Sequence, residues 1–391
     1  MAPGPPSAPR AIGLESPPGR RSKPLAGGCS PMSAHRMTRL VAVGLALSCA
    51  GATHAAPPHV VPAHAGPKPS AASVPALSRA DMDTTVSPCR DFNRYANGGW
   101  IDHATIPPAY AAWGSFTELA EKNQAVLRGI LDRAQADTKA AGGSDTGRLG
   151  AYWCACLDSA AADRDGAKPI ASLLDPIQQL GSTAALAGQV AALHDRGVRA
   201  LFAFRSAQDP KHSDWQIAHV EQGGIGLPDR DYYLRTDSAA VATRSRYVDH
   251  IVKTFALLGD DAQGARAAAE AILALETSLA KASMTNVQRR DPKATYHKVT
   301  VDSLKRMCPG FDWSAYLAAR GLATLDSVNV AQPDFVSALD GLIRSVPLET
   351  WKSELRWSVA GDAAPMLSGA FAEEDFRFQS VLSGTEAMLP R

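Results

Sequence analysis

The segment Gly226-Leu-Pro-Asp-Arg-Asp-Tyr-Tyr-Leu234 lies where the chain passes from short β-rich runs to long amphipathic stretches. Its opening Gly-Leu-Pro-Asp predicts a rigid turn, because proline fixes φ and glycine tolerates backbone conformations that other residues avoid. We expect Arg230, Asp231 and the two tyrosines to anchor this turn through hydrogen bonds. The segment is therefore interpreted as structural, without a direct catalytic role.

Two short β-rich runs precede this turn, at residues 200–205 and 215–220. The residues between them, 208–214, favour a turn, so the pattern predicts a small β-hairpin near 200–221. The Gly-rich loop 223–226 could cradle a phosphate with a helix N-terminus or a Lys-Ser/Thr pair behind it. It runs into Pro228 instead, and this disfavours phosphate binding.

The chain after Asp83 predicts a mainly α, multi-helix fold. Abundant alanine and an aromatic content of only 6% favour helix over sheet. One buried stripe is expected at Tyr247, Ile251, Phe255 and Leu258, and a second at Ile272, Leu275 and Leu279. Helices are expected at 146–160, 184–195, 262–283, 301–307, 313–320, 332–344 and 347–358.

A further helix is expected to begin at Ser115, because Ser115 and Glu118 have the spacing of a capping box. Its apolar face has helical spacing. The face comprises Phe116, Leu119, Ala120, Val126, Leu127, Ile130, Leu131 and Ala134.

The overall composition is that of a globular protein, with 45% hydrophobic and 20% charged residues. The formal net charge of +1 gives no electrostatic footprint for nucleic acid. From about residue 115 onward no apolar run reaches the roughly 18 residues that span a bilayer. We therefore expect neither a nucleic-acid partner nor a membrane span in the mature chain.

The N-terminus is typical of a targeting sequence. Residues 1–36 are rich in Pro, Gly, Ser and Arg, and are interpreted as disordered, as a gene-model extension ahead of a start at Met37. Residues 37–56 combine a basic start, a short apolar run and a small-residue cleavage site, which together predict a secretory signal peptide. A disordered Pro/Ala linker at 57–82 and a folded domain at 83–391 follow. The product is expected to be periplasmic or extracellular.

Six cysteines are present, of which Cys29 and Cys49 fall in the segments expected to be lost. Lipoprotein anchoring at Cys49 is the weaker alternative, because Ala46 stands where a lipoprotein signal has a branched apolar residue. Four cysteines remain in an oxidising compartment, and their pairing stays open. They are Cys89, Cys154, Cys156 and Cys308.

Four motifs in order along the chain carry a family resemblance. The first runs from Cys89-Arg-Asp-Phe-Asn-Arg-Tyr-Ala-Asn-Gly-Gly-Trp100 to Trp113-Gly-Ser-Phe116, and the second is Tyr152-Trp-Cys-Ala-Cys-Leu-Asp158. The third is the turn segment 226–234, and the fourth begins at Arg289-Arg-Asp-Pro-Lys-Ala-Thr-Tyr296. Together they resemble the N-terminal domain of neprilysin and endothelin-converting-enzyme relatives, which are zinc metallopeptidases of the gluzincin class.

The resemblance implies a zinc site of the His-Glu-x-x-His type and a later glutamate ligand, with the first glutamate as general base. In this sequence no histidine is followed by glutamate. His219 and Glu221 would share one face of a strand, but no second histidine joins them, so a metal site there is disfavoured. We therefore assign no catalytic, cofactor-binding or metal-binding residue to this chain, and expect zinc only in the complete family protein.

The resemblance also places the last residues, 376–391, in a segment that leads into the family's catalytic domain. We thus expect a truncated or split product, the N-terminal part of an exported metalloendopeptidase acting on short peptides and inactive alone. Ala112 and Thr117 stand where many members carry charged residues that bind substrate, so that role is not transferred. A separate catalytic half is a possible partner. The alternative is a standalone secreted helical module that binds peptides or a partner chain.

Overall fold

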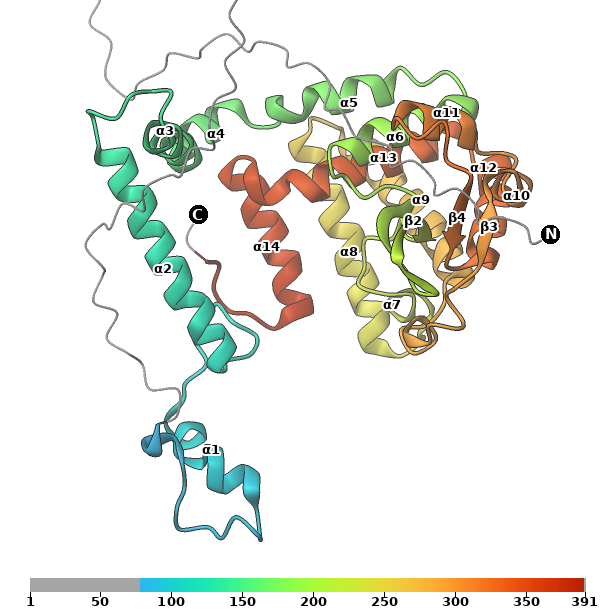
Figure 1. The fold of residues 1–391 in the computed structure, drawn as a ribbon. Helices are drawn as coiled ribbons and strands as arrows, with labels where there is room; N and C mark the ends of the chain where they lie inside the picture. Colours follow the sequence, from blue (N-terminus) through green and yellow to red (C-terminus); the bar gives the residue numbers. More distant parts are fainter. Residues whose placement is uncertain (1–77, 390–391) are drawn as a thin grey trace, which may run out of the picture. The chain divides into compact units, whose positions relative to one another are not determined.

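A computed structural model describes residues 78–389 of the chain (Figure 1). The chain divides into two compact units. The described residues of the first are 131–154, and those of the second are 78–130 and 155–389. The predicted signal peptide and almost all of the predicted linker lie outside the described residues.

The fold is mainly α, as the sequence predicts, with one small mixed sheet. The N-terminal helices are α1 (Phe92–His103), α2 (Ser115–Ala136), α3 (Asp145–Leu157), α4 (Ser159–Asp165), α5 (Ala171–Gln178), α6 (Leu186–Asp195) and α7 (Asp231–Leu234). The others are α8 (Ser238–Leu257), α9 (Ala262–Ala282), α10 (Val301–Met307), α11 (Trp313–Ala319), α12 (Pro333–Ser345), α13 (Leu348–Ala363) and α14 (Gly369–Ser383).

Most of the predicted helices are confirmed, several to within one or two residues. Helix α10 covers the predicted residues 301–307, and the stripe Ile272, Leu275 and Leu279 on α9 is buried. Acidic N-caps fix the starts of the two longest core helices: Asp237 accepts from the Ala240 amide, and Asp261 accepts from the Gly264 amide. The sequence patterns predicted neither α5 nor α14.

The predicted hairpin exists, but it is half of a four-stranded sheet. The strands are β1 (Phe202–Asp209), β2 (His212–Gln222), β3 (Lys298–Thr300) and β4 (Ser327–Val330), in the order β1-β2-β4-β3. β1 pairs antiparallel with β2, β2 parallel with β4, and β4 antiparallel with β3. The last two strands are three and four residues long, too short to give a pattern in the sequence.

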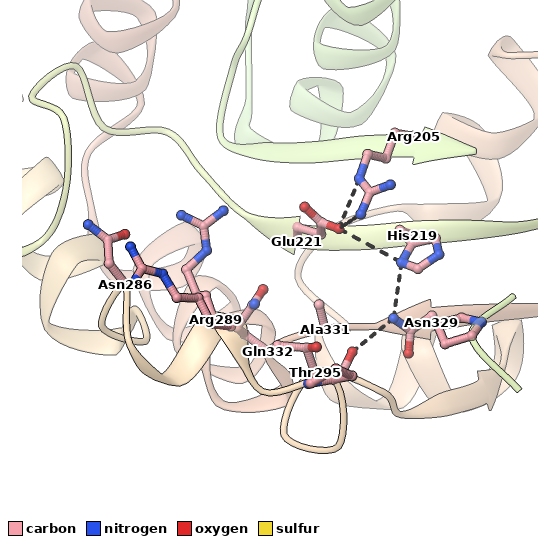
Figure 2. Close-up of a pocket in the computed structure, with 12 residues that line it drawn as sticks. Arg205, His219, Glu221, Asn286, Arg289, Thr295, Asn329, Ala331 and Gln332 are labelled. Carbon is pink, nitrogen blue, oxygen red and sulfur yellow. Dashed lines mark hydrogen bonds and ion pairs between the residues drawn. The ribbon is translucent and has the colours of Figure 1, made fainter. Parts of the chain in front are cut away.

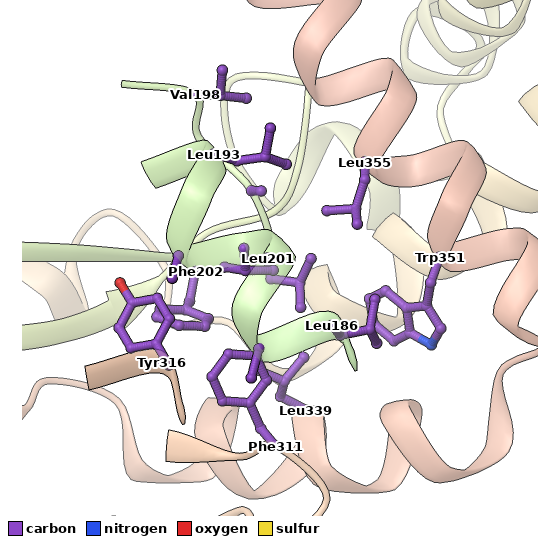
Figure 3. Close-up of a cluster of buried hydrophobic side chains, with 14 of the residues drawn as sticks. Leu186, Leu193, Val198, Leu201, Phe202, Phe311, Tyr316, Leu339, Trp351 and Leu355 are labelled. Carbon is purple, nitrogen blue, oxygen red and sulfur yellow. The ribbon is translucent and has the colours of Figure 1, made fainter. Parts of the chain in front are cut away.

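The main core lies where α6, α11, α12 and α13 pack on the sheet (Figure 3). Phe202 of β1 lies edge-on to Phe311 and Tyr316, with ring centroids 5.4 Å apart in each case. Trp351 of α13 is fully buried in the same cluster. A second cluster joins Tyr247 and Phe255 of α8 to Ile272 of α9 and Trp357 of α13. The first cluster includes residues of the sheet, and the second includes Leu227 and Tyr233 of the turn that follows it.

Two expectations for the first helices are wrong. The spacing of Phe92, Tyr95 and Trp100 in the first motif predicts core aromatics on one helical face, but Phe92 is 69% exposed and Gly98 is the one buried residue of α1. The capping box is also absent: α2 begins at Ser115 itself, and the Glu118 carboxylate accepts from the Trp100 indole at 3.1 Å.

The apolar face of α2 is present but largely uncovered. Phe116 is 91% exposed and Leu127 58%, and Ala134 is the one buried residue of this helix. Ala134 belongs to the first unit, where a Cβ at Gly150 would lie 2.5 Å from its carbonyl oxygen. The close approach of α2 and α3 in that unit therefore requires glycine at this position. None of the described helices is long and apolar enough to cross a membrane.

Candidate functional site

A pocket of about 420 Å³ opens beside β2, and we call it the β2 pocket (Figure 2). The hairpin contributes Arg205, His219 and Glu221 to its wall, and β4 contributes Asn329. The loop after α9 adds Arg289 and Arg290. Its volume lies in the range of small-ligand sites, and its wall is mostly polar.

The protonation state of His219 follows from its hydrogen bonds. The Asn329 amide is oriented from both sides: its Oδ1 accepts from the His297 amide at 2.6 Å, and its Nδ2 donates to the Thr295 carbonyl at 3.0 Å. The same Nδ2 lies 3.1 Å from His219 Nδ1, which must therefore accept. Burial, and then the charge of Arg205, lower the pKa of His219. The ring is thus neutral, with its hydrogen on Nε2.

The Nε2–H of His219 is left without an acceptor among the described residues. The side chain is only 6% exposed, so water does not solvate this donor freely. An unsatisfied buried donor costs about 1–3 kcal/mol. The Nε2–H of His219 is therefore an unsatisfied hydrogen-bond donor within the described part of the chain.

The charges of the β2 pocket are unbalanced. Arg205 donates to Glu221 Oε1 from Nε at 3.0 Å and from Nη2 at 2.5 Å, and so neutralises that carboxylate. Arg289 and Arg290 form no ion pair or side-chain hydrogen bond with residues 78–389. The pocket thus has an excess of positive charge.

A metal ion does not fit this donor set. His219 and Glu221 do lie on one face of β2, 3.8 Å apart between Nδ1 and Oε1. However, the carboxylate is held by a guanidinium and Nδ1 by an amide, and two further arginines line the same wall. Within residues 78–389, no three His, Cys, Asp or Glu side chains are grouped so that they could hold a metal.

The Gly-Leu-Pro turn is anchored on one buried carboxylate, Glu276 of α9. Its Oε1 accepts from the Gly226 amide and from the Tyr247 hydroxyl, both at 2.8 Å. Its Oε2 accepts from the Tyr233 hydroxyl at 3.0 Å, and that hydroxyl accepts in turn from the Leu227 amide. The Gly226 and Leu227 amides are therefore occupied and cannot cradle a phosphate.

A second buried carboxylate lies close enough to Glu276 to interact with its charge. Glu354 of α13 is 2% exposed, and its Oε2 has no hydrogen-bond partner among the described residues. Burial raises the pKa of Glu276 to about 7, against the opposing effect of its hydroxyl and amide donors. Burial and then the charge of Glu276 raise the pKa of Glu354 well above its usual value. Near neutral pH, Glu354 is therefore the protonated member of the pair.

The turn residues take the structural roles predicted from the sequence, with one difference. Arg230 donates to the Ala280 carbonyl, and the Asp229 carboxylate caps the Asp231 amide. The anchor itself, Glu276, was not predicted. Its signal is a charged residue in an otherwise apolar helical stripe, Ile272-Leu-Ala-Leu-Glu276.

Within the described residues, no disulfide lies in the main core. Cys89 and Cys156 are exposed free thiols, so neighbouring Cys154 and Cys156 are not bonded to each other. Cys308 is a buried free thiol of the main core, and burial raises its pKa to about 12. This cysteine is therefore a packing residue.

The fold is that of a helical domain with an anchored Gly-Leu-Pro turn. Its described residues contain no group of three His, Cys, Asp or Glu side chains that could hold a metal ion. The chain belongs to peptidase family M13, whose model matches residues 88–391. It is 30% identical to endothelin-converting enzyme 1 of Rattus norvegicus over 326 residues, which are 79% of this chain and 42% of that protein. The same enzyme of Homo sapiens is 30% identical over 82% of this chain and 42% of its own length. The chain thus spans less than half the length of these relatives.

Solved structures agree with this assignment. The zinc metalloprotease Zmp1 of Mycobacterium tuberculosis, in complex with an inhibitor, aligns with a TM-score of 0.74 and 31% identity. The alignment covers 80% of this chain and 48% of that one. PepO of Lactobacillus rhamnosis shares the fold at 16% identity and a TM-score of 0.62. The family model confirms the predicted family, and both solved structures confirm the predicted fold class.

Proposed function

We propose that the chain forms the non-catalytic helical part of an exported zinc metalloendopeptidase that acts on short peptides. The observation that carries the proposal is the family match over residues 88–391, together with coverage of less than half of each relative. Zinc chemistry would then come from residues outside the described part of this chain. The helical domain would bind or enclose the peptide beside that centre.

The exposed apolar stripe of α2 supports a contact between this domain and a second polypeptide region. Phe116, Leu119, Val126, Leu127 and Ile130 are all at least 42% exposed. An apolar surface of this kind marks a contact with another protein surface. In the proposal, the zinc-bearing part of the peptidase covers this stripe.

The predicted signal peptide at 37–56 supports export to the periplasm or beyond, with the linker 57–82 as a tether to the folded domain. Fusion of residues 37–56 to a reporter that is active only outside the cytoplasm should give activity. Replacing Leu47 in the apolar run with arginine should abolish it, because a charge interrupts the apolar region that the export machinery reads. Activity that persists in this variant would contradict the assignment.

The proposal is tested by the DNA that follows codon 391. We expect an open reading frame that encodes His-Glu-x-x-His and a later glutamate ligand. Co-expressed with that product, the chain should form a complex with chelator-sensitive peptidase activity. An unrelated downstream gene would instead favour the standalone binding module.

The α2 stripe gives a matched pair of variants for this complex. Leu127→Glu should weaken assembly at least about tenfold, because it places a charge in the apolar contact. Glu121→Gln removes a charge from the same helix outside the stripe, and its amide oxygen can still accept from the Tyr110 hydroxyl, so assembly should be retained. Pull-down at graded concentrations measures both. Equal assembly of Leu127→Glu and the unchanged chain would show that the stripe is not the contact.

A further inference from the structure

The β2 pocket has donors without acceptors. Arg205 and Glu221 compensate each other, which leaves the charges of Arg289 and Arg290 unpaired within the described part of the chain. His219, in the same wall, adds a buried Nε2–H that has no acceptor there. The two unpaired guanidinium groups thus require a complement that is rich in negatively charged oxygen.

The arginines restrict what that group can be. A guanidinium presents a planar fork of donors that matches the oxygens of a carboxylate or a phosphate. A cation would be repelled, and an apolar ligand would leave these guanidinium donors unsatisfied. The volume of about 420 Å³ admits a small ligand or the end of a chain, but no folded partner.

The pocket is also stiff enough to select its ligand. Asn329 is fixed by the His297 amide and the Thr295 carbonyl, and it holds the His219 ring in turn. Arg205 is fixed by two hydrogen bonds to Glu221. Only Arg289 and Arg290, both exposed, remain free to move onto a ligand. A wall that is fixed by hydrogen bonds, with Arg289 and Arg290 available for contact, is suited to bind an anion.

We propose that the β2 pocket binds a small oxyanion, with Arg289 and Arg290 as its charged contacts and His219 as a positioning residue in the wall (Figure 2). The oxyanion is either free phosphate or the terminal carboxylate of a peptide, which share this chemistry. The proposal does not depend on the peptidase assignment, because the site lies wholly within this chain.

Titration calorimetry on the full chain at low salt tests the proposal with three probes: inorganic phosphate, an acetylated tripeptide with a free carboxylate, and its C-terminal amide. We expect phosphate, the free acid or both to bind, and the amide not to bind. Arg289→Gln and Arg290→Gln should each weaken binding about tenfold or more. Arg196→Gln removes an exposed arginine far along the sequence, at the end of α6, and should leave the affinity unchanged.

The three probes also separate the two sources of the oxyanion. Binding of phosphate alone assigns a free ion, and binding of the acid but not the amide assigns a peptide terminus. In either case the imidazole nitrogen resonance of His219 Nε2 should shift on titration. Absence of binding by both anions at millimolar concentration would overturn the proposal. Equal weakening by Arg196→Gln and the two pocket variants would overturn it as well, because it would indicate general charge attraction.

Discussion

Replacement of Gly226 by alanine is expected to destabilise the domain by about 3 kcal/mol, although residue 226 lies at the surface. An added Cβ would lie 2.0 Å from the Tyr247 hydroxyl and 3.2 Å from Glu276 Oε1. The Tyr247 ring cannot easily move away from the added methyl group, because its hydroxyl also accepts a hydrogen bond from the Trp357 indole at 2.7 Å. The methyl group would therefore separate the turn from its anchor. Chemical denaturation followed by tryptophan fluorescence measures the loss.

Gly188→Ala is the matched control for this substitution. Gly188 lies on the exposed side of α6, and nothing comes within 4 Å of an added Cβ. Alanine should there increase the free energy of unfolding by about 0.5–1 kcal/mol, because it favours the helix. If Gly226→Ala proved as harmless as Gly188→Ala, the turn would not be held by Glu276.

Glu354→Gln is expected to stabilise the domain at alkaline pH. The folded state holds a proton on the Glu276–Glu354 pair that the unfolded chain releases near pH 4.5, since both folded pKa values are raised. The stability that this proton contributes is complete below about pH 4.5 and is lost as the pH rises through about 7 and above. Glutamine keeps the shape of the side chain but cannot ionise, so the variant should keep this stability as the pH rises.

The expected size is about 2 kcal/mol in favour of Glu354→Gln at pH 8, and close to zero at pH 5. Tyr233 and Tyr247 face the pair from α7 and α8, but burial raises the pKa of each further above 10, so they stay neutral throughout. Thermal unfolding from pH 5 to pH 8 gives the comparison. Glu373→Gln, on the exposed side of α14, controls for a general change of charge. A constant difference across this pH range would refute the shared-proton account.

The sequence predicts those parts of the fold that local pattern determines. The stripes of α8 and α9 have helical spacing, and the turn at 226–229 has the proline and glycine that it needs, so both were predicted. Phe92 shows the limit of the same rule. A helical pattern identifies an apolar face, but it does not say whether another element covers that face.

The candidate sites depend on contacts between residues far apart in the sequence, and these could not be predicted. Glu276 and Glu354 come from different helices, and neither has a metal or nucleophile motif around it. Asn329 reaches His219 only because β4 pairs parallel with β2, and β4 has four residues. The sequence did place His219 and Glu221 on one face of a strand, because alternation in a strand is a local property.

The central proposal is that this M13 chain forms the non-catalytic helical part of a zinc metallopeptidase, whose zinc chemistry would come from residues outside 78–389. Zinc content and peptide hydrolysis of the purified 391-residue chain, measured with and without a chelator, test it most directly. We predict zinc far below one ion per chain, and no cleavage that the chelator abolishes. One bound zinc per chain, with hydrolysis lost on chelation, would contradict the claim.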